Sequence, residues 1–109
     1  VYKRQRVYRI TPGADPATAA EVYAEGFTNI IDIAFGPNGR LYVLEIFKNG
    51  LLSGDLTGAL IRVNADGSQT LITDQLTAPG GLAITRNGTF YVSNKTIFAG
   101  KGELLQIKP

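Results

Sequence analysis

The feature that most constrains the fold of this 109-residue chain is an internal repeat of strand, tight turn and strand. One copy occupies residues 29–45 and a second occupies residues 80–94. Each copy places Asn-Gly between two apolar runs, and Asn-Gly favours a two-residue hairpin turn. Asn38 and Asn87 are 49 positions apart, as are Ile33 and Leu82. A repeat of this length built from short strands predicts an all-β repeat architecture.

The pattern predicts nine short strands. They are expected at residues 6–10, from residue 21, and at residues 30–35, 40–46, 59–63, 68–73, 82–84, 90–92 and 103–107. Asp15 followed by Pro16 is a local helix-start signal. The repeat aligns residues 20–24 with the strand at residues 69–73, so we favour a strand from Glu21 and leave a helical turn at residues 16–19 open. Residues 47–58 are expected to form a loop.

Four short antiparallel strands per unit of roughly 40–50 residues are typical of a β-propeller blade. The inner strand carries a small residue at its centre, Ala34 or Ala83. The second strand, residues 40–46, is apolar on both faces, as expected where neighbouring blades cover both sides. We predict an all-β fragment of a β-propeller of four-stranded antiparallel blades. One full blade (28–76) is flanked by the last two strands of one blade (6–27) and the first three of the next (77–109).

A closed propeller needs about 4–8 blades, because a single repeat cannot bury both of its apolar faces. The sequence also begins without Met. We therefore expect a fragment of a longer protein, with the remaining blades of the same propeller as its partners. The alternative is assembly with other copies of itself.

The composition excludes several kinds of chemistry. There is no Cys and no His, so disulfides, thiolate sites, a Ser-His-Asp triad and a His-ligated metal are impossible within this chain. Residues 1–5 resemble a translated sequencing adapter and are expected to be a non-native or disordered tail. Without them the net charge of +2 becomes zero, and we expect no nucleic-acid partner. No apolar run reaches 18 residues and no signal peptide is visible, so no membrane span is expected.

The candidate site residues are Asp32, Glu45 and Asn94. In an antiparallel meander, the connections that enter each first strand and leave each second strand lie on the same rim. Glu45 and Asn94 end equivalent strands, and Asp32 is a carboxylate in an apolar inner strand. Oxygen side chains of this kind suit a hard cation. The alternative is structural: Asp32 caps backbone N–H groups, and Glu45 and Asn94 are solvated strand ends.

Other candidates have a structural interpretation that we favour. Lys48, Lys95 and Lys101 could meet an anionic ligand, but loop lysines are usually solvated. The three glycines of the residue 47–58 loop lack the spacing of a phosphate-binding loop. Tyr42 and Tyr91 recur within the repeated core strand and are expected to pack.

The segment Ile33-Ala34-Phe35-Gly36-Pro37-Asn38-Gly39-Arg40-Leu41-Tyr42-Val43 resembles the ScyD/ScyE family of propeller proteins, named for scytonemin biosynthesis. So do Gly58-Ala59-Leu60-Ile61-Arg62-Val63 and Ala78-Pro79-Gly80-Gly81-Leu82-Ala83. The resemblance extends to the broader group of NHL, SMP-30/gluconolactonase and quinoprotein sugar dehydrogenase propellers. It implies a periplasmic or extracellular protein of the six-bladed type.

The resemblance implies three functions. The first is a non-catalytic binding or scaffold module with a small-molecule ligand or partner at the rim. The second is a lactonase or hydrolase of SMP-30 type, in which Asp32 and Glu45 are among the ligands of a divalent cation such as calcium. The third is a remnant of a quinoprotein sugar dehydrogenase, which the lack of His disfavours. We favour the first and expect no catalytic residue in this chain.

Overall fold

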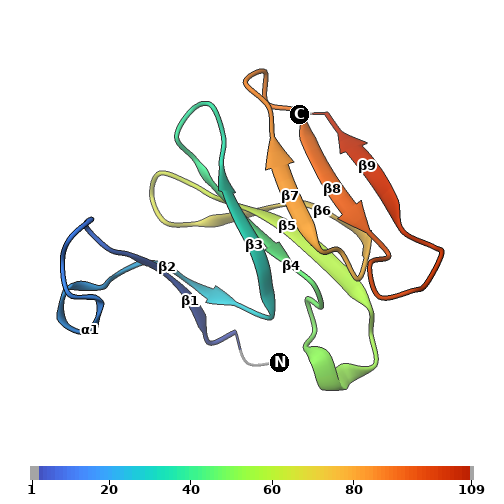
Figure 1. Cartoon of the computed structure of the whole chain (residues 1–109), viewed down its shortest axis with the longest axis horizontal. Coiled ribbons are helices and arrows are strands. Elements are labelled where there is room, and N and C mark those ends of the chain that lie inside the picture. Colours follow the sequence, from blue (N-terminus) through green and yellow to red (C-terminus); the bar gives the residue numbers. More distant parts are fainter. Residues whose placement is uncertain (1–2, 109) are drawn as a thin grey trace.

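The computed structural model describes residues 3–108 and is all-β, with three separate antiparallel sheets (Figure 1). The first sheet pairs β1 with β2, the second has the order β3-β4-β5-β6, and the third has the order β7-β8-β9. The strand bounds are β1 Gln5–Arg9, β2 Glu21–Phe27, β3 Ile30–Phe35, β4 Leu41–Glu45, β5 Thr57–Val63, β6 Gln69–Thr77, β7 Gly81–Ile84, β8 Phe90–Asn94 and β9 Glu103–Ile107. The predicted all-β class and the grouping of two, four and three strands are confirmed.

The two Asn-Gly hairpin turns form, but the predicted two-residue length is wrong. The Gly36 N–H donates to the Arg40 carbonyl and the Thr85 N–H to the Thr89 carbonyl, so three residues form each turn, and the positive φ falls on the glycine and not on the asparagine. Gly39 and Gly88, the second residues of the two Asn-Gly pairs, have φ angles of +79° and +85°. These angles lie in the left-handed region that glycine adopts without a steric cost. The turns set the register of β3 against β4 and of β7 against β8, so that Ala34 lies opposite Tyr42 and Ala83 opposite Tyr91.

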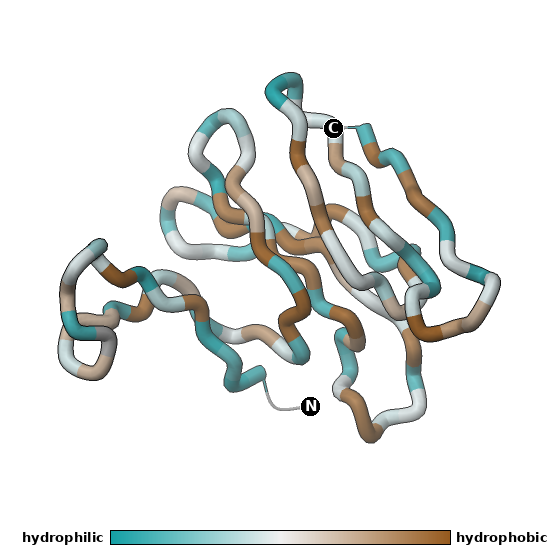
Figure 2. The backbone as a smooth tube through the Cα atoms, viewed as in Figure 1, coloured by the Kyte–Doolittle hydropathy of each residue, from teal (hydrophilic) through white to brown (hydrophobic). Residues whose placement is uncertain are grey.

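The three sheets stack face to face, and the middle sheet is covered on both sides. All five residues of β4 are buried. Leu41 and Val43 pack in one cluster with Val7 of β1, whereas Tyr42 and Leu44 pack in a second cluster with Val92 of β8. Strand alternation explains this division, because successive side chains point to opposite faces. The apolar residues lie within the strands, and the hairpin turns are polar (Figure 2).

The sequence left open a helical turn at residues 16–19 ahead of a strand from Glu21, and the structure contains both. A short helix, α1, covers Pro16–Ala19, and the Asp15 side chain caps it by accepting a hydrogen bond from the Ala17 N–H. β2 then begins at Glu21, as the repeat predicted. Of the expected tail, residues 1 and 2 lie outside the described residues. Gln5 is the first residue of β1, and its side-chain oxygen accepts a hydrogen bond from the Ile30 N–H at 2.6 Å.

Several strands extend beyond their predicted bounds, and the extensions of β5 and β6 change the loop between β4 and β5. β5 begins at Thr57 and β6 continues to Thr77, so the loop predicted for residues 47–58 is shorter. Backbone pairing of Thr57 with Thr77 and of Gly58 with Leu76 holds these ends together. A single-turn 3₁₀ helix, η1 (Leu51–Ser53), lies in the remaining loop. Within residues 3–108, no helix is long and apolar enough to cross a membrane.

Candidate functional site

The long loops of two successive units lie at the same end of the molecule. Residues 46–56 connect β4 to β5 and residues 95–102 connect β8 to β9, and both loops lie at the lower end of Figure 1. The β3–β4 and β7–β8 hairpin turns lie at the opposite end. The segment that enters β3 is on the same rim as the long loops, because the first residue of β3, Ile30, lies opposite the last residue of β4, Glu45. The segment that enters β7 has the equivalent position, because Gly81 lies opposite Ser93 near the end of β8. This rim is the place predicted for a site.

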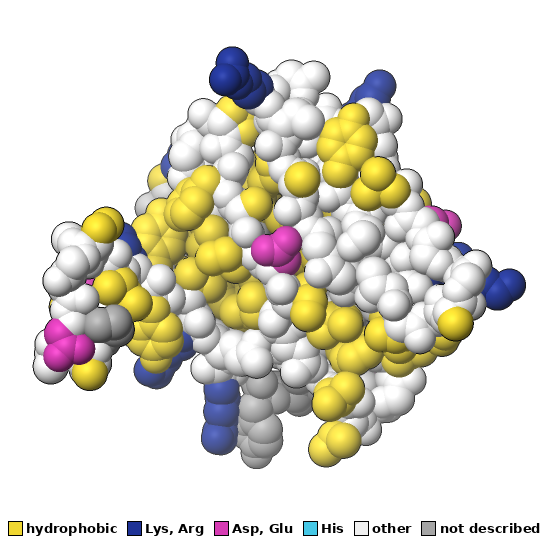
Figure 3. All heavy atoms as spheres, viewed as in Figure 1, with side chains coloured by type: hydrophobic (Ala, Val, Ile, Leu, Met, Phe, Trp, Pro, Cys, Tyr) yellow, Lys and Arg dark blue, Asp and Glu magenta, His cyan; other side chains and the backbone are white. Residues whose placement is uncertain are grey.

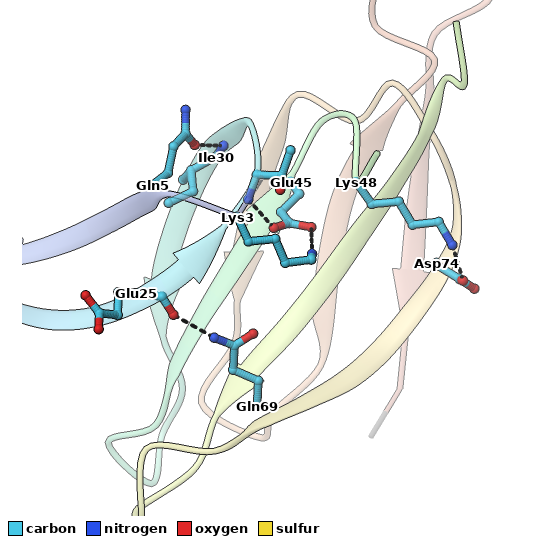
Figure 4. A network of polar contacts seen from close by, with 9 residues as sticks. Lys3, Gln5, Glu25, Ile30, Glu45, Lys48, Gln69 and Asp74 are labelled. Carbon is cyan, nitrogen blue, oxygen red and sulfur yellow. Dashed lines mark hydrogen bonds and ion pairs between the residues drawn. The ribbon is translucent and has the colours of Figure 1, made fainter. Parts of the chain in front are cut away.

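Glu45 is fully buried at this rim and holds the corner between β2 and β3. Its Oε2 accepts a hydrogen bond of 2.6 Å from the Thr28 N–H, and its Oε1 is 3.9 Å from the Lys3 Nζ (Figure 4). Burial raises the pKa of the Glu45 carboxyl, and the Thr28 N–H and the Lys3 charge oppose that rise. Glu45 is therefore a buried residue whose side chain fixes the corner between β2 and β3, and it is not a solvated strand end.

Asn94 holds the equivalent corner of the next unit. Its Oδ1 accepts a hydrogen bond of 2.8 Å from the Thr77 N–H, and its Nδ2 donates to Glu103 Oε1 at 3.0 Å. The sequence separation from Asn94 to Thr77 is 17 residues, the same as from Glu45 to Thr28. Like Glu45, Asn94 is buried. In both units, the last residue of the second strand thus accepts a hydrogen bond from the backbone just before the first strand, and this bond is part of the repeat.

Asp32 connects the inner strands of two sheets. Its Oδ1 accepts from the Ile33 N–H and its Oδ2 accepts from the Leu82 N–H, each at 2.8 Å. The second bond joins β3 to β7. Asp32 lies opposite Leu44, and Glu45 lies opposite Ile30, with a β-bulge between the two pairs. Asp32 therefore faces the third sheet, while Glu45 faces the first.

The structure therefore does not bring the three predicted residues together in one cluster. Asp32, Glu45 and Asn94 each bond a different backbone N–H group, from Leu82, Thr28 and Thr77 respectively. The structural alternative describes Asp32, which accepts from two backbone N–H groups. For Glu45 and Asn94 that alternative is wrong, because both are buried and are not solvated strand ends. A shared cation at Asp32 and Glu45 stays a prediction.

Three buried side-chain oxygens at the β2–β3 corner accept no hydrogen bond from residues 3–108. They are Thr28 Oγ1, Asn29 Oδ1 and Glu45 Oε1. Oxygen donors of this type suit a hard cation, and the Lys3 ammonium is the cation that lies beside one of them. Within the same described residues, no three acidic side chains gather closely enough to hold a metal ion. Thr28 and Asn29, which enter β3 on the rim that the sequence predicted, are thus candidate oxygen donors near Glu45.

Two of the loop lysines have acidic partners. Lys48 Nζ lies 2.8 Å from Asp74 Oδ2, which raises the pKa of Lys48 and lowers that of Asp74. Lys95 Nζ lies 3.8 Å from Glu103 Oε1. Tyr42 packs edge-to-face on Phe90 with ring centroids 4.9 Å apart, so its expected packing role is confirmed.

The rim also carries exposed apolar side chains that the sequence reasoning passed over. Leu52, at the tip of the β4–β5 loop, is 98% exposed, and Leu51 beside it is also exposed. Ile97 and Phe98 are the exposed apolar pair of the β8–β9 loop. Figure 2 shows a hydrophobic stretch within each of these loops, between white and hydrophilic parts of the chain. The sequence signal that could have indicated these residues is a pair of adjacent apolar residues within a glycine-containing loop.

Comparison with known proteins gives no assignment. No family model matches the chain, and neither a curated protein nor a solved structure matches it. The site must therefore be interpreted from its own geometry.

Proposed function

We propose that this chain is part of an exported β-propeller repeat protein of the ScyD/ScyE type, and that it acts as a binding or scaffold module. Three face-to-face antiparallel sheets in chain order support the propeller, because a propeller stacks consecutive meanders in this way. The resemblance of residues 33–43 to that family supports the type. The ligand rim is the one that carries the β4–β5 and β8–β9 loops.

The contrast between the two rims carries the binding proposal. One rim exposes the apolar pairs Leu51-Leu52 and Ile97-Phe98 at equivalent loops of successive units. The opposite rim has the tight polar turns Pro37-Asn38-Gly39 and Arg86-Asn87-Gly88. Exposed apolar side chains that gather on loops over a rigid scaffold are typical of an interaction site.

The polar residues of the same rim support binding rather than catalysis. Asp32, Glu45 and Asn94 all accept hydrogen bonds from backbone N–H groups. Such bonds hold strand ends in place, and they use both carboxylate oxygens of Asp32 and one of the two of Glu45. The sequence also contains no His or Cys that could act as a base or nucleophile.

Ligand-observed NMR with a panel of aromatic, aliphatic and sugar compounds tests the proposal. Compounds with apolar groups should bind. The double variant Leu52→Ser/Phe98→Ser should weaken the affinity measured from their saturation transfer by about thirtyfold, since two lost apolar contacts of roughly 1 kcal/mol each sum to about 2 kcal/mol. Leu71→Ser/Phe35→Ser is the matched control, because Leu71 is exposed in the middle of β6 and Phe35 is exposed at the end of β3 beside the opposite rim. Equal loss in both double variants, or binding of no compound, would contradict the proposal.

The second candidate is a divalent-cation-dependent lactonase or hydrolase of SMP-30 type. The observation that favours it is the set of unpaired buried oxygens on Thr28, Asn29 and Glu45. This candidate requires lactone hydrolysis that depends on calcium and is lost in Glu45→Gln. Hydrolysis equal to a buffer blank at all calcium concentrations would exclude it.

A further inference from the structure

We propose that the open edge of β1 and the apolar face of β3 form the docking surface for one more β-hairpin. The hairpin is equivalent to β3–β4 and belongs to a further repeat unit of the same polypeptide. This inference rests on the propeller part of the proposed function. It adds where the first two strands of the preceding sheet dock.

The outward face of β3 is apolar and exposed. Ile31, Ile33 and Phe35 are 43%, 41% and 57% exposed. Ile33 pairs with Val43 and Phe35 with Leu41, so these side chains lie on the face of the middle sheet that packs on the first sheet. Figure 3 shows apolar side chains gathered on this side of the molecule. Three large apolar side chains in one row are an unfilled part of the stacking interface.

The next unit shows what covers the equivalent row. The counterparts of Ile33 and Phe35 are Leu82 and Ile84 of β7, which are only partly exposed. They pack in the cluster that contains Tyr42 and Leu44 of β4. Thus the first two strands of one sheet cover the first strand of the following sheet. Over residues 3–108, the first sheet consists of β1 and β2, without the first two strands of the pattern.

The position of β1 places the missing hairpin. By the repeat, β1 matches β5 and β9, and each of these strands pairs antiparallel with the second strand of its unit. In the described part of the chain, β1 pairs only with β2. An open groove between β1 and β3 is lined by residues 5–8 and 30–33. A strand that paired with the free edge of β1 would lie in this groove, against Ile31 and Ile33.

A second copy of the chain fits this surface less well than a further repeat unit. Its two hairpins of the required type are β3–β4 and β7–β8. The first is already paired with β5 and the second with β9. A second copy would have to break one of those pairings before its hairpin could reach β1, whereas a hairpin joined directly to β1 has no such cost.

The test is an extended chain that carries a second copy of residues 28–57 directly ahead of Gln5. This connection reproduces the β4–β5 link, since β1 matches β5. Amide hydrogen exchange of residues 5–9 is measured by NMR in the extended chain. The control has an extension of the same composition in scrambled order. In addition, a synthetic peptide with the sequence of residues 28–46 is titrated into the unextended chain.

We expect exchange in β1 to slow by about tenfold or more in the extended chain only. Phe35→Asp in the chain's own β3 should abolish that gain, and the peptide should shift resonances in β1 and β3 alone. The proposal is wrong if neither the extension nor the peptide affects β1. It is also wrong if the unextended chain dimerises and Phe35→Asp makes it monomeric. Compound binding at the loop rim is independent of both results, so the two proposals fail separately.

Discussion

Glu45 and Asn94 accept a backbone hydrogen bond from the residue 17 positions earlier, at the same corner of two successive repeats. Both are buried, yet one is a carboxylic acid and the other an amide. The corner bond is therefore a structural element of the repeat, and the difference in side chain changes its electrostatics. Asn94 has an acceptor for its second polar atom. Among the described residues, the second oxygen of Glu45 has only the Lys3 ammonium, at 3.9 Å.

The Glu45 corner should make stability depend on pH. Burial raises the pKa of Glu45 above its ordinary value of 4.5, so the folded chain binds this proton more tightly than the unfolded chain. The resulting contribution to stability is complete below pH 4.5 and is lost as the pH rises through the folded-state pKa. Glu45→Gln keeps an oxygen for the Thr28 N–H and should flatten this dependence, with a higher melting temperature at pH 7.

Thermal unfolding between pH 3 and pH 8 measures the effect. Glu25→Gln is the control, because the Glu25 carboxylate is exposed and lies in an ion pair with Arg6. An unchanged pH profile in Glu45→Gln would contradict the assignment of a raised pKa to this residue.

The Asn94 corner should not tolerate a carboxylate. Asn94→Asp keeps the acceptor for Thr77 but turns the donor toward Glu103 into a second negative oxygen. We expect a loss of about 1–3 kcal/mol in the free energy of unfolding at pH 7. Denaturant unfolding measures it, and Glu103→Gln added to the same chain should restore part of the loss by supplying a donor. Failure of that rescue would show that the lost bond to Glu103 is not the cause.

Asp32 should act as a clamp between the second and third sheets. Asp32→Asn leaves one oxygen for two N–H donors, Ile33 and Leu82, which lie 2.8 Å from the two carboxylate oxygens. The expected cost is about 1–3 kcal/mol for the donor left unpaired. In the control Asp66→Asn, a single oxygen serves both bonds to Ser68, so the change should stay within about 0.5 kcal/mol. Equal stability of the two variants would contradict the clamp.

Gly58, near the start of β5, should not tolerate replacement by a residue with a side chain. A Cβ at Gly58 would lie 2.4 Å from Pro79 Cδ and 2.8 Å from the Glu45 carbonyl oxygen. Gly58→Ala should therefore cost about 1–3 kcal/mol or more, since the proline ring and the backbone cannot move freely. Gly102→Ala is the matched control, because a Cβ there meets nothing within 4 Å. Denaturant unfolding of both variants should separate them clearly.

The parts of the fold that could be predicted are those that short-range chemistry fixes. The Asn-Gly turns determine two hairpins, and the two-sided apolar pattern of residues 41–45 predicts a strand covered on both faces. The end of β6 could not be predicted, because Asp74 and Gln75 are poor strand residues that pairing with β5 holds in place. In the same way, the corner bonds of Glu45 and Asn94 depend on closure over 17 residues. The sequence indicated their equivalence but not their partners.

The measurement that most directly tests the central claim is a calcium titration followed by thermal unfolding. We claim that Asp32 and Glu45 hold strands and that binding takes place at the apolar loops. The account predicts that calcium leaves the melting temperature of the chain unchanged, and that Asp32→Ala lowers it equally with and without calcium. A melting temperature that rises with calcium, with the rise abolished by Asp32→Ala, would contradict the account and favour the cation-dependent hydrolase.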